Sequence, residues 1–323
     1  DKVLFSMEDE ANQTVVIEEI SPRQNYIIRK SVHKTSHGQL LAANVDQAIF
    51  IFTYKFPKTS LGFLDRFLVT AEAFRIPVTI VFNKMDLLNE EEKDQIFEWA
   101  GLYQELGYGV LFTSIPLNQG ISEFKEMFEG KVSLMAGHSG VGKSSLLNIV
   151  APTLHIKTKE ISDFAQKGVH TTTYSTMWEL GPDTYLIDSP GINEFGVMEI
   201  EKEELAHYFP EMRALLGQCK FNNCLHLHEP HCVVQQAVKD GEIASSRYLS
   251  YFSIFVQISF ANPSAVGVPF HLRLSHIKGN MRTTSSFELH KSSIFSMCFI
   301  AVMMVFNSSL STISTQYTSF GEQ

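Results

Sequence analysis

Short hydrophobic runs alternate with polar breaks along much of the chain, and their spacing predicts its secondary structure. Between residues 46 and 200, strand-like runs such as "AIFIFT" and "VTIVF" alternate with longer amphipathic stretches such as "LGFLDRFLVTAEAF". This alternation is typical of a parallel sheet covered by helices on both faces. We therefore expect residues 46–200 to form one α/β domain.

The segments on either side of this domain have other patterns. Residues 1–45 contain three short β-type runs, which predict part of a small β-barrel. Residues 201–256 are charged and helical in pattern and include a cluster of Cys and His, so a compact helical appendage is expected. In residues 257–323, Ser, Thr and apolar residues follow no period, and the sequence assigns this tail neither a fold nor a function.

Composition narrows the class of protein. A chain of 323 residues is long enough for two or three domains. Its net charge of -9 argues against a broadly basic surface, so contact with nucleic acid must be local, as in the carboxylate-free stretch from Ile20 to Val45. Four cysteines are too few for a disulfide scaffold and indicate a cytoplasmic protein. The longest apolar run, at 294–306, is too short for a membrane-spanning helix, so no membrane association is expected.

A phosphate-binding loop is predicted at "GHSGVGKSS", which follows a strand-like run and opens a helix-like one. Its glycines allow successive N–H groups to point at phosphate oxygens, and the helix presents its positive end. Lys143 would reach the β and γ phosphates as a catalytic group, and Ser144 would ligate Mg²⁺. The alternative is a glycine-rich turn with no ligand. The residues expected to bind the phosphates are Gly137, His138, Ser139, Gly140, Val141, Gly142, Lys143, Ser144 and Ser145.

A guanine-binding loop is predicted at "NKMDLL", where a buried strand ends in Asn83, Lys84 and Asp86. The Asp86 carboxylate could accept hydrogen bonds from guanine N1–H and the exocyclic amine, which adenine does not offer in that arrangement. The alternative is a helix-capping turn with Asp86 or Asn89 as the cap. After the next strand, "FTSIPLNQG" places Ser114 where a base-stacking loop is expected.

Two further elements follow the phosphate loop. The strand "TYLID" ends in a D-x-x-G motif, in which Asp188 would bind Mg²⁺ through water and Gly191 would donate its N–H to the γ phosphate. In "KGVHTTT", one of three threonines is expected to contact Mg²⁺ when GTP is bound, and Thr172 is the preferred candidate. Because the base loops precede the phosphate loop, the order indicates a circularly permuted GTPase domain whose switch leads directly into the helical appendage.

A structural zinc site is predicted in "CKFNNCLHLHEPHC". Cys219, Cys224, His226 and Cys232 offer three thiolates and one imidazole, which suffice for tetrahedral Zn²⁺. His228 and His231 compete with His226 for the nitrogen ligand. The alternative is free cysteines in a helical hairpin.

Together these residues resemble the circularly permuted GTPases of the RsgA (YjeQ) type, which act in small ribosomal subunit maturation. The resemblance extends over about residues 1–255 and rests on the motifs above together with "RQNYIIR", "AANVDQAIFIF" and "EIASSRYLSY". It implies an N-terminal OB-fold, of which 1–45 could supply only a part, followed by the permuted GTPase and a zinc-binding helical domain. The partners implied are GTP and GDP, the small ribosomal subunit and its rRNA, with a monomeric protein expected.

The water-positioning residue departs from the Ras-like pattern. Ile192 follows the D-x-x-G glycine where Ras-like proteins have a glutamine, and its side chain cannot hydrogen-bond water. The resemblance suggests His170 as the catalytic residue instead, and the alternative is a solvated loop histidine. Two other functions stay open at this point. They are a P-loop ATPase or kinase, which has no use for Asp86, and a nucleotide-gated rRNA-binding assembly factor with negligible turnover.

Overall fold

The structure of the chain is a computed structural model, which describes residues 1–9, 12, 14–30, 38–152, 175–188 and 200–261. By its internal contacts the chain divides into Asp1–Ala261 and Asn262–Gln323, and the second unit lies outside the described residues. The apolar run at 294–306 lies there too. None of the described helices is both long and apolar enough to cross a membrane.

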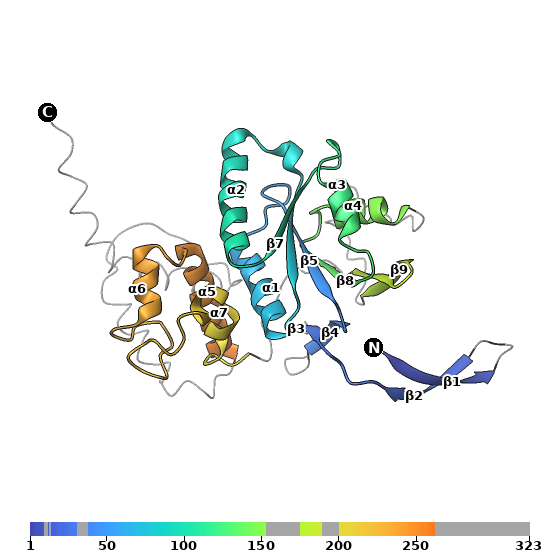
Figure 1. Cartoon of the computed structure of the whole chain (residues 1–323), viewed down its shortest axis with the longest axis horizontal. Helices are drawn as coiled ribbons and strands as arrows, with labels where there is room; N and C mark the ends of the chain where they lie inside the picture. The colour runs from blue at the N-terminus through green and yellow to red at the C-terminus, as the bar shows by residue number, and fades with distance from the viewer. Residues whose placement is uncertain (10–11, 13, 31–37, 153–174, 189–199, 262–323) are drawn as a thin grey trace, which may run out of the picture. The chain divides into compact units, whose positions relative to one another are not determined.

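A six-stranded sheet forms the centre of the described fold (Figure 1), in the order β7-β6-β5-β8-β10-β9. Its strands are β5 (Gln47–Phe52), β6 (Val78–Asn83), β7 (Gly109–Thr113), β8 (Val132–Ala136), β9 (Thr176–Gly181) and β10 (Thr184–Asp188). Five of them run parallel, as the alternating pattern predicts. The edge strand β9 is antiparallel to β10, because only Pro182 and Asp183 separate the two strands and a connection that short permits only a hairpin.

Helices cover both faces of this sheet, as Figure 1 shows: α1 (Leu61–Ala73) and α2 (Glu90–Glu105) lie on one side, and α3 (Ile121–Glu126) and α4 (Lys143–Val150) on the other. All six residues of β5 are buried. Because successive side chains of a strand point to opposite faces, Phe50 and Phe52 pack toward α1 and α2, and Ile49 and Ile51 toward α3 and α4. The uninterrupted apolar run of β5 therefore reflects burial on both faces.

Helix α2 follows the short 3-10 turn η1 (Met85–Leu87) and begins at a capping box, in which Asn89 and Glu92 bond to each other's backbone N–H groups. Asn89 is therefore the helix cap, one of the two residues considered for that role. The buried residues of α2 are Ile96, Ala100 and Tyr103. Their spacing of four and three places them on one helical face toward the sheet.

The N-terminal segment forms two separate antiparallel pairs. One joins β1 (Val3–Asp9) to β2 (Thr14–Ile20), and the other joins β3 (Tyr26–Lys30) to β4 (Gly38–Ala43), a strand that the sequence pattern did not predict. Apolar side chains of β1 and β2 are exposed, Leu4 by 58%. In contrast, Ile27 and Leu41 belong to the same buried cluster as α1 and β5. The second pair is therefore part of the core of the α/β domain.

The C-terminal part of the described chain is helical: η3 (Leu205–Tyr208), α5 (Pro210–Arg213), α6 (Val233–Asp240) and α7 (Ser245–Ala261). The helical character expected of residues 201–256 begins with two short pieces, η3 and α5, rather than one long helix. Pro210 starts α5 and cannot continue η3, because it has no N–H and its ring clashes with the preceding turn. Side chains from all four elements share a core, which also includes Val69 of α1.

Candidate nucleotide site and metal centre

The residues predicted to bind nucleotide lie at one edge of the sheet. Asn83 ends β6, Ser114 follows β7, Gly137 follows β8 and Asp188 ends β10. Because these four strands are parallel, their carboxyl ends meet at that edge. Ligand sites of open α/β sheets are found in this position.

Two glycines of the phosphate loop have backbone conformations that a side chain would disturb. Gly137 has φ of +146° and Gly142 has φ of +100°, both in the region that L-residues avoid. A Cβ on Gly137 would lie 2.7 Å from the carbonyl oxygen of Ile51, and one on Gly142 would lie 2.5 Å from Nδ2 of Asn83. The G-x-x-x-x-G spacing is therefore required by the contacts of this loop with β5 and with the base loop.

Lys143 lies inside the phosphate loop, with only 9% of its surface exposed. Its Nζ donates to the carbonyl oxygens of Gly137 at 2.7 Å and His138 at 2.6 Å. Burial lowers the pKa of Lys143 to about 8, against the opposing effect of Asp188. Burial also raises the pKa of Asp188, and Lys143 partly offsets that rise. One carboxylate oxygen of Asp188, Oδ1, is buried without a hydrogen-bond partner among the described residues. Such an oxygen, beside a buried ammonium, fits a site that takes phosphate and a hard cation.

The base loop is bonded to the phosphate loop. The Asn83 Nδ2 amide donates to the carbonyl oxygen of Val141 at 2.9 Å, and Thr113 Oγ1 donates to Asn83 Oδ1 at 3.0 Å. The Nζ of Lys84 donates to the carbonyl oxygen of Gly140 at 2.8 Å and to that of Phe56. Asn83 and Lys84 thus hold the two loops in register.

Asp86 contacts the second base loop. The Ser114 hydroxyl donates a 2.7 Å hydrogen bond to Asp86 Oδ1. Since Asn89 caps α2, the carboxylate of Asp86 has no capping function there. Asp86 is therefore not the cap of α2, and its carboxylate is instead held by the second base loop.

Three residues at this edge were not singled out by the sequence motifs. Phe56 accepts from Lys84, Thr113 positions Asn83, and Phe63 of α1 stacks on the imidazole of His138 with ring centroids 3.8 Å apart. They belong to no nucleotide-binding motif, and their proximity arises only when β5, α1 and β7 are folded against the phosphate loop.

Several predicted residues lie outside the described part of the chain. They are His170 and Thr172 in the threonine-rich loop, Gly191 in the D-x-x-G motif, and Ile192 after it. Ser139, Ser144 and Ser145 are described, and they lie in the phosphate loop and the first turn of α4.

The predicted metal ligands lie together. One ligand atom from each of Cys219, Cys224, His226 and Cys232 lies within 4.8 Å of the other three. Nδ1 of His226 is 3.6 Å from Cys219 Sγ and 3.4 Å from Cys232 Sγ, and the Sγ atoms of Cys219 and Cys232 are 4.0 Å apart. A tetrahedron with Zn–S near 2.3 Å and Zn–N near 2.0 Å has edges of about 3.5 to 3.8 Å. The donor set and its spacing therefore fit Zn²⁺.

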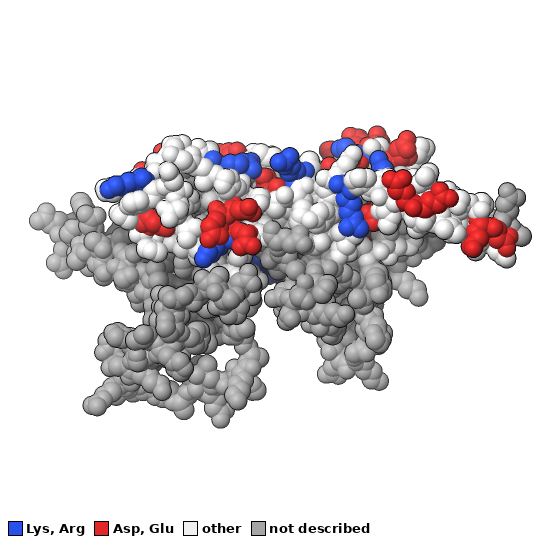
Figure 2. Space-filling view, turned by 90° about the horizontal axis from the view of Figure 1, so that it is seen from below, with Lys and Arg blue, Asp and Glu red and all other residues white. Residues whose placement is uncertain are grey.

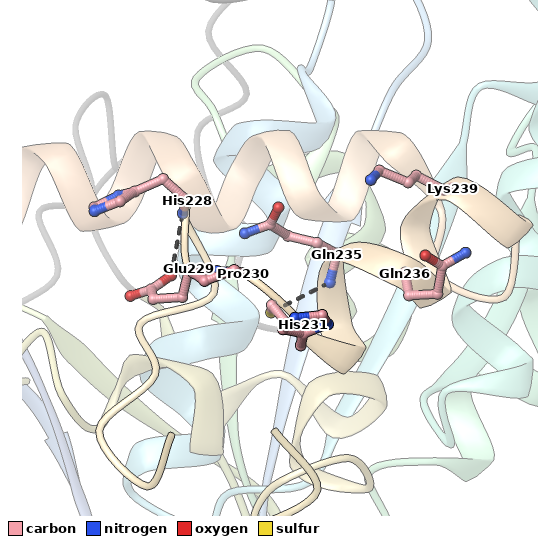
Figure 3. A pocket seen from close by; sticks show the side chains of 8 residues that line it. His228, Glu229, Pro230, His231, Gln235, Gln236 and Lys239 are labelled. Atoms are coloured by element: carbon pink, nitrogen blue, oxygen red, sulfur yellow. Dashed lines mark hydrogen bonds between the residues drawn. The ribbon is translucent and has the colours of Figure 1, made fainter. Parts of the chain in front are cut away.

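The two competing histidines do not join this group. Figure 3 shows that His228 and His231 instead line a polar pocket together with Gln235 and Lys239 of α6. Both histidines are exposed, whereas His226 is only 3% exposed. Burial lowers the pKa of His226 and so favours the neutral imidazole that a metal requires.

The loop around the cluster is held by hydrogen bonds. The carboxylate of Glu229 accepts from the backbone N–H groups of Leu225, Leu227 and His228, and Figure 3 shows the bond from His228. Burial alone would raise the pKa of Glu229, but these bonds lower it to about 2. From α7, the Tyr248 hydroxyl donates to the carbonyl oxygen of His226 at 2.7 Å. These hydrogen bonds fix the loop to α7.

Comparison with known proteins identifies relatives of this arrangement. The model of the family described as RsgA GTPase matches residues 20–198. The Small ribosomal subunit biogenesis GTPase RsgA of Flavobacterium johnsoniae is 47% identical over 76% of this chain and 76% of its own length. That of Cytophaga hutchinsonii is 51% identical, covering 74% of this chain and 78% of the relative.

Two solved structures have a similar fold. YjeQ from Thermotoga maritima superposes with a TM-score of 0.63 at 36% identity, covering 79% of this chain and 82% of that one. YloQ, described as a circularly permuted GTPase, superposes with a TM-score of 0.61 at 33% identity, covering 80% and 79%.

Proposed function

This chain belongs to the RsgA GTPase family, and from that premise we propose that it binds the small ribosomal subunit and hydrolyses GTP during the maturation of that particle. It is a GTP hydrolase with a circularly permuted α/β GTPase fold. The observation that carries the proposal is the convergence of the base loops and the phosphate loop at one sheet edge, linked by Asn83 and Lys84.

For the nucleotide, we propose the following contacts. The Asp86 carboxylate accepts from guanine and is oriented by Ser114, whose hydroxyl it already binds. Phosphate oxygens replace the carbonyls of Gly137 and His138 as acceptors from Lys143, which neutralises negative charge that develops during phosphoryl transfer. The other residues assigned to the nucleotide are Asn83, Lys84, His138 to Gly142, Ser144, Ser145 and Gly191.

A magnesium ion bound with GTP would neutralise part of the negative charge of the phosphates. Ser144 and the partnerless Oδ1 oxygen of Asp188 supply oxygen donors of the type Mg²⁺ prefers. We propose Thr172 as the third oxygen donor to the magnesium ion. For the attacking water we propose His170 as the orienting residue, since Ile192 cannot hydrogen-bond it.

The Cys/His cluster is proposed as a structural Zn²⁺ site with four protein ligands and no open position for chemistry. Its role is to stabilise a helical domain that is short of regular structure between α5 and α6. We further propose that β1 and β2 belong to an OB-fold, because their apolar side chains lack a covering layer among the described residues.

Contact with ribosomal RNA would have to be local. On the face shown in Figure 2, Lys and Arg side chains are interspersed with Asp and Glu, and the described residues form no continuous basic tract there. This agrees with the net charge of -9. We propose that the protein binds the assembling subunit as a monomer in the cytoplasm.

The decisive experiment compares GTP hydrolysis by the full chain with and without purified small ribosomal subunits. We expect slow intrinsic turnover and a marked increase with subunits. Lys143→Ala should abolish both, because it removes the charge that contacts the phosphates. GTP-dependent binding to the subunit with no increase in turnover would instead establish a nucleotide-gated assembly factor.

A further inference from the structure

Helix α1 is shared between two hydrophobic cores. Phe63, Phe67 and Leu68 pack in the core of the α/β domain, and Val69 packs in the core of the helical appendage. All four side chains are at most 3% exposed. Since packed interiors transmit displacement rather than absorb it, α1 cannot move against one core without disturbing the other.

The first turn of α1 contacts the phosphate loop. Its residue Phe63 stacks on His138 with ring centroids 3.8 Å apart and 21° between the planes. In the segment before the helix, Pro57 borders Gly140, where an added Cβ would lie 3.4 Å from Cδ of the proline. Phe56 in that segment accepts a hydrogen bond from Lys84. The phosphate loop is thus held on its outer side by the start of α1.

The next turn of α1 is anchored to the appendage by a buried ion pair. Arg247 of α7 donates to Asp65 Oδ1 at 2.6 Å, and the two side chains are 1% and 0% exposed. The same guanidinium binds Glu211 of α5 through two hydrogen bonds, at 2.7 and 3.2 Å. Tyr103 of α2 donates to Asp65 Oδ1 at 2.7 Å. Asp65 therefore couples α1 to elements of both the appendage and the α/β domain.

We propose that α1 couples the helical appendage to the phosphate loop, with Phe63 as the positioning residue that acts through His138. A shift of α7 against the domain is carried by the Arg247–Asp65 pair to α1, and by the Phe63–His138 stack to the loop that cradles the phosphates. This path is distinct from the covalent connection between the D-x-x-G motif and the appendage. It rests on the proposed function only in requiring that this loop binds nucleotide phosphate.

A double-mutant cycle tests the coupling. The dissociation constants of fluorescently labelled GTP and GDP are measured for the full chain, for Phe63→Leu, for Glu211→Gln and for the double variant. Phe67→Leu is the matched control, because it makes the same substitution one turn further along α1, where the ring packs on Phe50. Urea unfolding of each variant separates loss of stability from loss of affinity.

We expect Phe63→Leu to weaken GTP binding on the order of fivefold or more relative to Phe67→Leu, the scale of ordinary coupling between sites. Glu211→Gln, which loosens Arg247, should weaken binding in the parent chain but have no effect in the Phe63→Leu background. Equal affinities for the two leucine variants, or additive effects in the cycle, would overturn the proposal.

His138→Ala provides a second approach from the other side of the stack. The imidazole is only half-buried, so its removal leaves the core intact, and the variant replaces Phe63→Leu in the cycle if that protein does not fold. The same loss of coupling to Glu211 is expected. If the parent chain binds no GTP, the proposed function fails. If it binds GTP but the cycle is additive, only the coupling fails.

Discussion

The Ser114 hydroxyl and the Asp86 carboxylate are joined by a 2.7 Å hydrogen bond that links the loops following two neighbouring strands. This bond orients the carboxylate that we assign to guanine. Asp86→Asn should weaken GTP binding by ten- to a hundredfold, because the amide replaces an acceptor by a donor and about 1–3 kcal/mol is lost at an unpaired polar group. Xanthosine triphosphate, with a carbonyl in place of the amine, should bind the variant better than GTP does.

Titrations of GTP, ATP and xanthosine triphosphate measure this change in preference. ATP serves as the control, since its weak binding should be the same in both proteins. An unchanged ratio of GTP to ATP affinity would argue for an ATPase or kinase and against the base assignment.

Nucleotide affinity should decrease as the pH rises above about 8. Burial lowers the pKa of Lys143 to about 8 despite the opposing effect of Asp188. Bound phosphate favours the charged ammonium, so the pKa is higher in the complex. Binding is then strongest below the lower pKa and falls by up to about tenfold per pH unit above it.

Dissociation constants for GDP measured from about pH 7 to 9, roughly one unit on either side of that pKa, reveal the slope. Lys143→Ala is the reference, because ionisation of the guanine ring affects both proteins equally. Parallel profiles for the two proteins would show that Lys143 is not the titrating group.

Removing the buried cation should destabilise the protein far more than removing an exposed one. Arg247→Met leaves Asp65 and Glu211 without their partner in a region where the three side chains are at most 8% exposed. A cost of about 3–5 kcal/mol in the free energy of unfolding is expected. Arg213→Met is the matched control, because Arg213 pairs with Glu72 while 51% exposed, and it should cost less than about 1 kcal/mol.

Urea denaturation of both variants measures the difference. The double variant Arg247→Met with Asp65→Leu should recover part of the loss, since an uncompensated buried charge is removed. Equal destabilisation by the two arginine variants would show that the buried pair contributes no more than a surface pair.

Zinc content should depend on His226 and not on its neighbours. Cys219→Ser and His226→Ala should lose the metal, whereas His228→Ala and His231→Ala should retain it, because only His226 lies within the group of cysteines. Atomic absorption of the purified variants provides the measurement. Retention of zinc in His226→Ala together with its loss in His231→Ala would reverse the assignment.

The motifs of the nucleotide site were readable in the sequence because each is a short segment at the end of a buried strand. The run "VTIVF" before Asn83 and "VSLMA" before Gly137 predicted β6 and β8, and both strands are observed. Backbone conformation and strand order then bring the segments together. The order of the motifs along the chain was sufficient to indicate the permuted fold, which the solved relatives share.

Other features were not readable in this way. The strand β4 and the antiparallel direction of β9 depend on pairing with neighbours rather than on a distinctive local pattern. The helical pattern around Pro210 gave no helix bounds, and the break between η3 and α5 is seen only in the structure.

The sequence by itself determined the class of fold, the nucleotide and metal motifs and their permuted order, because these depend on local periodicity and on residue types within short windows. Only the tertiary structure decided which distant side chains meet. Arg247 and Asp65 are 182 positions apart, and the Phe63–His138 stack exists only when α1 lies against the phosphate loop. The sequence already favoured His226 over His228 and His231, and the tertiary structure adds the reason, since it buries His226 beside the three cysteines and leaves the other two exposed.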